Sequence, residues 1–158
     1  MDVHIMVDNP DMVSEIFAKA GADIITFHLE AVKDMDACLE LCRKIRAMGV
    51  QAGVSVKPKT AVEGLLAHLK EIDLILIMSV EPGFGGQSFM EDTLEKVRVL
   101  RERIEKEGLD TRIEIDGGIN GETAKLAVAA GVDTLVAGSY VFKNGIAESV
   151  DKLLACQR

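Results

Sequence analysis

Asp116 stands at a position suited to acid–base or metal chemistry. It directly follows a short apolar segment, Arg112–Ile115, and precedes Gly117 and Gly118. A carboxylate at the carboxyl end of a buried strand can exchange a proton with a ligand or bind a metal ion. The same side chain could instead cap a following helix, because Asp is a common N-cap residue. Position alone leaves these two interpretations equal.

Glycine-bearing segments follow three of the expected strands. They contain Gly83, Gly85 and Gly86 after one strand, Asp116–Ile119 after the next, and Ala137-Gly138-Ser139 after the last. Glycine lets backbone N–H groups approach an anion closely, and a helix start adds partial positive charge. One such segment alone would favour a simple tight turn. Three at the same ends of strands favour a phosphate site, which in barrels often lies beside the last two strands.

Two histidines and two methionines lie near strand ends. His4 lies within an apolar segment, where an imidazole is more often a hydrogen-bonded core group than a ligand. His28 ends the next apolar segment and could face the mouth of the sheet, with an equally strong structural alternative. Met6 and Met78 at such positions are usually core residues.

The elements that would position these residues alternate between two patterns. Short apolar segments predict strands at Val3–Val7, Asp23–Phe27, Gln51–Val56, Asp73–Met78, Arg112–Ile115 and Asp133–Ala137. Helical spacing predicts helices at Asp11–Ala20, Asp34–Met48, Glu91–Glu107, Glu122–Ala130 and Ile146–Ala155, with Thr60 as a further helix start. The alternation of strand and helix predicts a parallel sheet with helices on its faces. The related phrases at Ala20 and Ala130 indicate an internal β/α repeat.

The composition indicates one domain over residues 1–158, with 48% hydrophobic residues and a net charge of −8. That charge argues against nucleic acid or an anionic membrane as a partner. No segment approaches the ~20 apolar residues of a membrane helix. Cys38 and Cys42 fit small buried hydrophobic residues rather than a disulfide framework, which favours a cytoplasmic, reducing compartment.

Together these segments resemble the ribulose-phosphate 3-epimerase family. The resemblance rests on Val3–Val7, Ala20–Asp23, His28–Ala31, Met78–Gln87, Asp116–Ile119 and Ala137–Ser139. It implies a TIM-type (β/α) barrel, here incomplete, with six of the eight β/α units. The implied reaction interconverts ribulose 5-phosphate and xylulose 5-phosphate in the pentose phosphate pathway.

The resemblance also implies roles for individual residues. Asp116 is expected to be a catalytic aspartate, and Asp116 and His4 are expected to bind one divalent metal, with zinc the first choice and iron, manganese or cobalt as alternatives. The expected substrate and phosphate set comprises His4, Met6, Met78, Gly83, Phe84, Gly85, Gly86, Gly117, Gly118, Gly138 and Ser139. The methionines would form an apolar floor beneath the reacting carbons.

The sequence lacks two strands of the family pattern. The family has two further strands ahead of the first one here, carrying a serine and a His-x-Asp pair that supplies the other catalytic aspartate. We therefore expect a fragment or an internally initiated product with impaired activity. The alternatives are a non-catalytic phosphosugar-binding remnant and a transferase of the thiamine-phosphate synthase type. Allulose 6-phosphate is an alternative substrate, and a homo-oligomer is a possible state.

Overall fold

Six parallel strands form one curved sheet in the computed structural model, which describes residues 1–81, 83 and 86–156. The strands are β1 (Asp2–Ile5), β2 (Ile24–His28), β3 (Gln51–Val56), β4 (Leu74–Met78), β5 (Arg112–Asp116) and β6 (Thr134–Val136). Their spatial order follows the chain, so each strand pairs with the one before it and β1 and β6 form the two edges. The prediction of an incomplete six-strand β/α barrel is confirmed.

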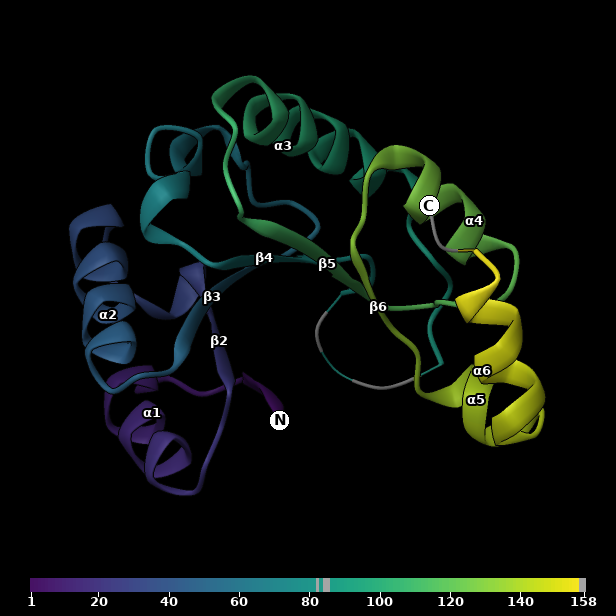
Figure 1. Ribbon diagram of the computed structural model, residues 1–158, viewed down its shortest axis with the longest axis horizontal. Helices are drawn as coiled ribbons and strands as arrows, with labels where there is room; N and C mark the ends of the chain where they lie inside the picture. The colour runs from purple at the N-terminus through teal and green to yellow at the C-terminus, as the bar shows by residue number, and fades with distance from the viewer. Residues whose placement is uncertain (82, 84–85, 157–158) are drawn as a thin grey trace.

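Helices cover the convex side of the sheet, which bends into an arch that is open on its concave side (Figure 1). The α-helices are α1 (Pro10–Lys19), α2 (Met35–Ala47), α3 (Leu94–Glu107), α4 (Thr123–Ala130), α5 (Ser139–Lys143) and α6 (Ile146–Leu154). Single 3-10 turns lie at Leu29–Ala31, Glu63–Leu65, Leu69–Glu71 and Glu91–Thr93. Five of the α-helices match expected ones within a few residues, whereas α5 was not expected.

The expected helix start at Thr60 is wrong. Between β3 and β4 the chain makes two 3-10 turns instead of an α-helix. Lys96 of α3 reaches across to this segment, where its Nζ donates hydrogen bonds to the carbonyl oxygens of Lys57 (2.9 Å), Pro58 (2.6 Å) and Thr60 (2.5 Å). The bond to the Thr60 oxygen occupies the backbone acceptor that an α-helix starting at Thr60 would need for its first turn.

Alternate strand residues face two different environments, because successive side chains of a strand point to opposite faces. The residues of the central strands that face the helices form the large core and include Phe27, Val54, Ile75 and Ile115. The opposite set contains a small apolar cluster around Leu76 and Met78, together with polar groups. The concave face therefore carries the side chains available for chemistry.

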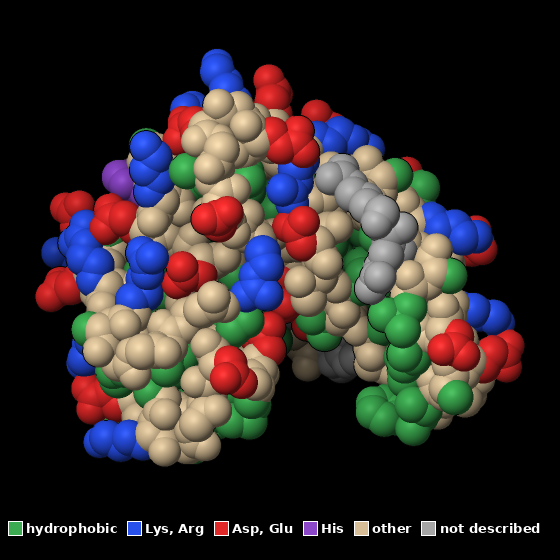
Figure 2. Space-filling view, viewed as in Figure 1, with side chains coloured by type: hydrophobic (Ala, Val, Ile, Leu, Met, Phe, Trp, Pro, Cys, Tyr) green, Lys and Arg blue, Asp and Glu red, His purple; other side chains and the backbone are tan. Residues whose placement is uncertain are grey.

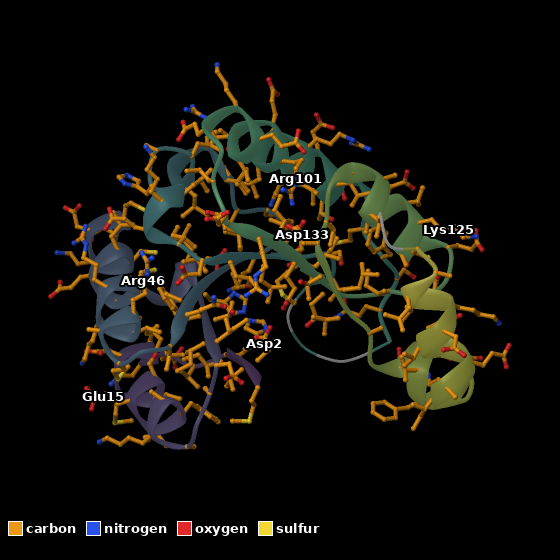
Figure 3. All side chains as sticks on the ribbon, in the orientation of Figure 1. Asp2, Glu15, Arg46, Arg101, Lys125 and Asp133 are labelled. Carbon is orange, nitrogen blue, oxygen red and sulfur yellow. The ribbon has the colours of Figure 1, made fainter. Side chains whose placement is uncertain are left out.

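Aspartates at the starts of strands lock neighbouring strands together. The Oδ2 of Asp73 accepts a hydrogen bond from the N–H of Ala52 at 2.9 Å, and the Oδ2 of Asp133 accepts one from the N–H of Ile113 at 2.8 Å. Asp133 also pairs with Arg101 of α3, and both side chains are labelled in Figure 3. These contacts fix the register of the sheet and hence the height of each strand end.

Among the described residues, no helix combines the length and the apolar character that crossing a membrane requires.

Candidate active site

A cavity of about 270 Å³ lies at the carboxyl ends of β4, β5 and β6. Nine of the expected site residues line it, namely Met6, Met78, Gly83, Gly86, Asp116, Gly117, Gly118, Gly138 and Ser139. Phe84 and Gly85 lie outside the described residues. The structure thus brings the three glycine-bearing segments and the β5 carboxylate to one place.

Asp116 ends β5 and is partly buried. Burial raises the pKa of its carboxyl group, because an apolar environment disfavours the charged form. Its alternative role as a helix cap is excluded, since the Oδ1 of Asn120 accepts the N–H groups of Glu122 (2.8 Å) and Thr123 (3.0 Å) at the start of α4. The Asp116 side chain is therefore available to the cavity.

Gly117 and Gly118 form a turn in which any larger residue would have to displace neighbouring atoms. Both have positive φ angles, 126° and 64°. A Cβ on Gly117 would lie 2.7 Å from a Val80 methyl, and one on Gly118 would lie 2.5 Å from the backbone nitrogen of Phe89. Glycine at these two positions lets the β5 turn pack directly against the loop that follows β4.

Ser79 joins that loop to the β5 turn. Its buried hydroxyl donates hydrogen bonds to the carbonyl oxygens of Asp116 (3.0 Å) and Gly117 (2.7 Å), and its N–H also donates to the oxygen of Asp116 at 2.8 Å. At the far end of the loop, the N–H of Met90 donates to the oxygen of Ser79 at 2.9 Å. The loop therefore leaves and returns at one point beside Asp116.

His4 lies on β1 and does not line the cavity directly. Its Nε2 lies 3.0 Å from the Nε2 of His28, which does line the cavity, and the two ring centres are 4.8 Å apart. Burial, helped by the neighbouring His28, lowers the pKa of His4 to about 4. Burial also lowers the pKa of His28. Both imidazoles are therefore neutral near pH 7.

Strands β1 and β5 approach each other across the concave face. The pKa of Glu114 is raised to about 8, first by burial and then by the nearby charges of Asp2 and Asp116. Figure 3 shows Asp2 on the concave side of the arch. His4 and Asp116 lie two residues further along the same two strands, so they share this face and point the same way.

Two of the expected metal ligands are present as suitable donors. His4 is neutral, as a metal-binding imidazole must be, and in the described residues no hydrogen bond or ion pair joins the Asp116 carboxylate. The described residues contain no group of three or more His, Cys, Asp or Glu side chains placed to hold a metal ion. The described residues thus show no complete metal site.

From the sequence, the role of His28 stayed open, and Glu30 was considered only as part of the family-like segment His28–Ala31. The Nδ1 of His28 lies 3.3 Å from the Oε2 of Glu30, while the Oε1 of Glu30 accepts the N–H of Lys57 at 2.9 Å and the Thr60 hydroxyl. The spacing of two between His28 and Glu30 was visible in the sequence. The approach of His28 to His4 depends on strand pairing and was not.

Comparison with known proteins extends these observations. Residues 1–142 match the model of the ribulose-phosphate 3-epimerase family. The chain is 49% identical over 142 residues to the ribulose-phosphate 3-epimerase of Mycobacterium tuberculosis (strain ATCC 25618 / H37Rv), covering 90% of this chain and 61% of that protein. It is 46% identical over 142 residues to the Escherichia coli (strain K12) ribulose-phosphate 3-epimerase, covering 90% of this chain and 62% of that protein.

Solved structures share the fold at low sequence identity. The 3-hexulose-6-phosphate synthase of Salmonella typhimurium superposes with a TM-score of 0.69 at 21% identity, covering 96% of this chain and 69% of that one. The D-psicose 3-epimerase of Clostridium cellulolyticum H10 gives a TM-score of 0.60 at 15% identity, and the match covers 99% of this chain and 70% of that one. These likenesses concern architecture alone. The family match over most of the chain and the identities near one half show that this chain belongs to the ribulose-phosphate 3-epimerase family.

Proposed function

We propose that this chain acts in the epimerisation of a ketopentose phosphate at carbon 3, which interconverts ribulose 5-phosphate and xylulose 5-phosphate. The observation that carries the proposal is the meeting of Asp116 with the glycine turns after β4, β5 and β6 in one cavity. The family match supports this chemistry over a transferase. The chain spans about 61% of the length of its relatives, so their activity is proposed rather than assigned.

Asp116 would be the proton carrier on one face of the sugar. Inverting a carbon beside a ketone requires removal of its proton and delivery of a proton to the opposite face. A carboxylate transfers protons best when its pKa is moved toward the working pH, and burial moves the pKa of Asp116 in that direction. The other aspartate implied by the resemblance belongs to a His-x-Asp pair that this sequence does not contain.

The glycine turns would bind the phosphate through backbone amides. The net charge of −8 gives this chain no general attraction for an anion. Close approach to the backbone at Gly117, Gly118 and Gly138 would provide N–H donors without a cationic side chain. Met78, which is 4% exposed, and Met6 would cover the apolar side of the sugar.

His4 and Asp116 would hold one divalent cation, with zinc as our first choice because imidazole and carboxylate both suit it. Iron, manganese and cobalt accept the same donors. When bound, such an ion would supply Lewis-acid stabilisation of negative charge on the substrate oxygens.

The proposal is tested by incubating the purified chain with ribulose 5-phosphate and Zn²⁺ or Mn²⁺, with xylulose 5-phosphate formation followed in a coupled assay. We expect slow turnover that Asp116→Asn reduces at least ~100-fold, a typical contribution of a general acid–base. Binding of the sugar phosphate with no turnover above the Asp116→Asn level would contradict the proposal. That outcome would instead support a non-catalytic phosphosugar-binding protein.

A further inference from the structure

Three side chains form a continuous contact from the loop after β2 to strand β1. Glu30 lies beside the Nδ1 of His28 at 3.3 Å, and the Nε2 of His28 lies 3.0 Å from the Nε2 of His4. His28 is buried, His4 is partly buried, and 23% of the Glu30 side chain is exposed. Nothing in the reaction outlined above requires His28 or Glu30, so the contact needs its own explanation.

The carboxylate of Glu30 determines where the imidazole protons lie. A carboxylate only accepts hydrogen bonds, so the Nδ1 of His28 must carry the proton that faces it. The Nε2 of a neutral His28 is then a bare acceptor. The Nε2 of His4 faces that acceptor and must donate. The remaining nitrogen of His4, Nδ1, is left with a free lone pair.

We propose that Glu30 and His28 are positioning residues that fix His4 in one orientation and one tautomer, with its Nδ1 lone pair available to bind a divalent cation. The inference rests on the proposed function, because it assigns His4 as a metal ligand. Metal-binding histidines commonly donate their other ring N–H to a neighbouring group, which fixes the ring and its tautomer. Here the neighbour is a second histidine, which is itself fixed by a carboxylate.

The surroundings of Glu30, His28 and His4 favour this arrangement of protons. Burial opposes ionisation of Glu30, but hydrogen bonds from the Thr60 hydroxyl and the Lys57 N–H outweigh it, so the pKa of Glu30 is lowered and its carboxylate is charged. The 3.0 Å contact between the two Nε2 atoms needs one donor and one acceptor, so at least one of the two rings carries a single proton. With one proton on each ring, the Glu30 carboxylate beside the Nδ1 of His28 leaves only the arrangement described.

The first test is the ¹⁵N NMR spectrum of the imidazoles in the metal-free wild-type chain at neutral pH. Protonated and bare ring nitrogens give well-separated signals. We expect His28 to carry its proton on Nδ1 and His4 on Nε2. A His4 proton on Nδ1 would overturn the inference without any variant. Because no substrate or metal is present, this result is independent of whether the chain turns over a sugar phosphate.

Glu30→Gln gives a sharper test. In the wild type, the Lys57 N–H and the Thr60 hydroxyl both donate to the Oε1 of Glu30. The amide oxygen of the glutamine would take that place. Its NH₂ group would then face the Nδ1 of His28 and donate to it. His28 must then carry its proton on Nε2 and donate to His4. His4 would carry its proton on Nδ1 and lose the lone pair. We therefore expect both tautomers to reverse in this variant.

Zn²⁺ affinity provides the second readout, measured by competition with a chromophoric chelator. We expect Glu30→Gln to weaken Zn²⁺ binding by about 10–100-fold, as loss of a ligand's supporting partner does. Glu102→Gln, an exposed change on α3, is the matched control and should bind as the wild type does. Unchanged tautomers, or equal Zn²⁺ affinity in all three proteins, would overturn the inference. Thermal melts of the variants establish that each is folded.

Discussion

At the scale of single residues, β5 places two carboxyl groups with different environments on one face. Glu114 is 2% exposed, and in the described residues its Oε2 has no hydrogen-bond partner. Asp116, two residues further, opens into the cavity. The deeper group is held neutral at neutral pH, whereas the outer one can reach a ligand. Neighbouring carboxyls in unequal environments are a common way to divide structural and chemical roles.

The pKa of Glu114 makes the stability of the fold depend on pH. Its pKa is about 8 in the folded chain and 4.5 for the ordinary group. Between these values the unfolded chain has released a proton that the folded chain retains, so stability falls as pH rises through this window. We expect the melting temperature of the metal-free chain to fall between pH 5 and pH 8, and to fall less in Glu114→Gln. Equal declines in both proteins would contradict this.

The sequence could reveal site residues whose position depends on local order. Asp116 and its glycines follow a strand directly, so their place at the strand end could be predicted. The partner of His4 could not, because the contact joins β1 to the end of its neighbouring strand β2 and depends on how the two strands pair. The spacing of residues along the chain does not predict that the Nε2 atoms of His4 and His28 lie 3.0 Å apart.

At the scale of elements, the turn after β5 is tightly constrained by its neighbours. Gly118→Ala would combine a φ of 64° with a Cβ lying 2.5 Å from the backbone nitrogen of Phe89. We expect a loss of about 1–3 kcal/mol or more in the free energy of unfolding, measured by urea denaturation. Gly64→Ala is the control, since its Cβ would meet only the Met35 methyl at 3.6 Å. Similar losses in both variants would contradict this account of the turn.

Helix α3 holds the last strand in place through Arg101. The guanidinium donates to the oxygen of Gly131 through Nε (2.9 Å) and Nη2 (2.8 Å) and also pairs with Asp133 at the start of β6. Lys cannot reproduce this forked geometry. We expect Arg101→Lys to lower the free energy of unfolding by about 1–2 kcal/mol. Arg103→Lys, at a more exposed pair with Glu107, should change it by less than ~0.5 kcal/mol. A reversed order of the two effects would disprove this role.

Local signals predicted most elements, and tertiary contacts explain why no α-helix begins at Thr60. Asp34 caps α2 as expected, since its Oδ1 accepts the N–H of Ala37 at 2.9 Å. Gly108, which directly follows the expected helix Glu91–Glu107, ends α3 in the left-handed conformation that glycine adopts readily. Thr60 has the residue type of a helix start, but its oxygen is held by Lys96 and its hydroxyl by Glu30. Such long-range partners are not encoded in the local pattern.

At the scale of the whole molecule, the arch brings separate β/α units to one rim. Figure 2 shows the opening between the two arms, with hydrophobic side chains on both sides of it. The parallel direction of all six strands places their carboxyl ends together, and the curvature turns β1 toward β5. No single unit contains the site, so its chemistry depends on the sheet as a whole.

The central claim is that Asp116 exchanges a proton with carbon 3 of a bound sugar phosphate. It is tested most directly by incubating the chain with Zn²⁺ and either ribulose 5-phosphate or xylulose 5-phosphate in D₂O and following deuterium at carbon 3 by NMR. This exchange requires only one proton carrier. We predict deuterium uptake into at least one of the two sugars, with its rate reduced at least ~100-fold in Asp116→Asn. Uptake no faster than in Asp116→Asn, for both sugars, would contradict the account.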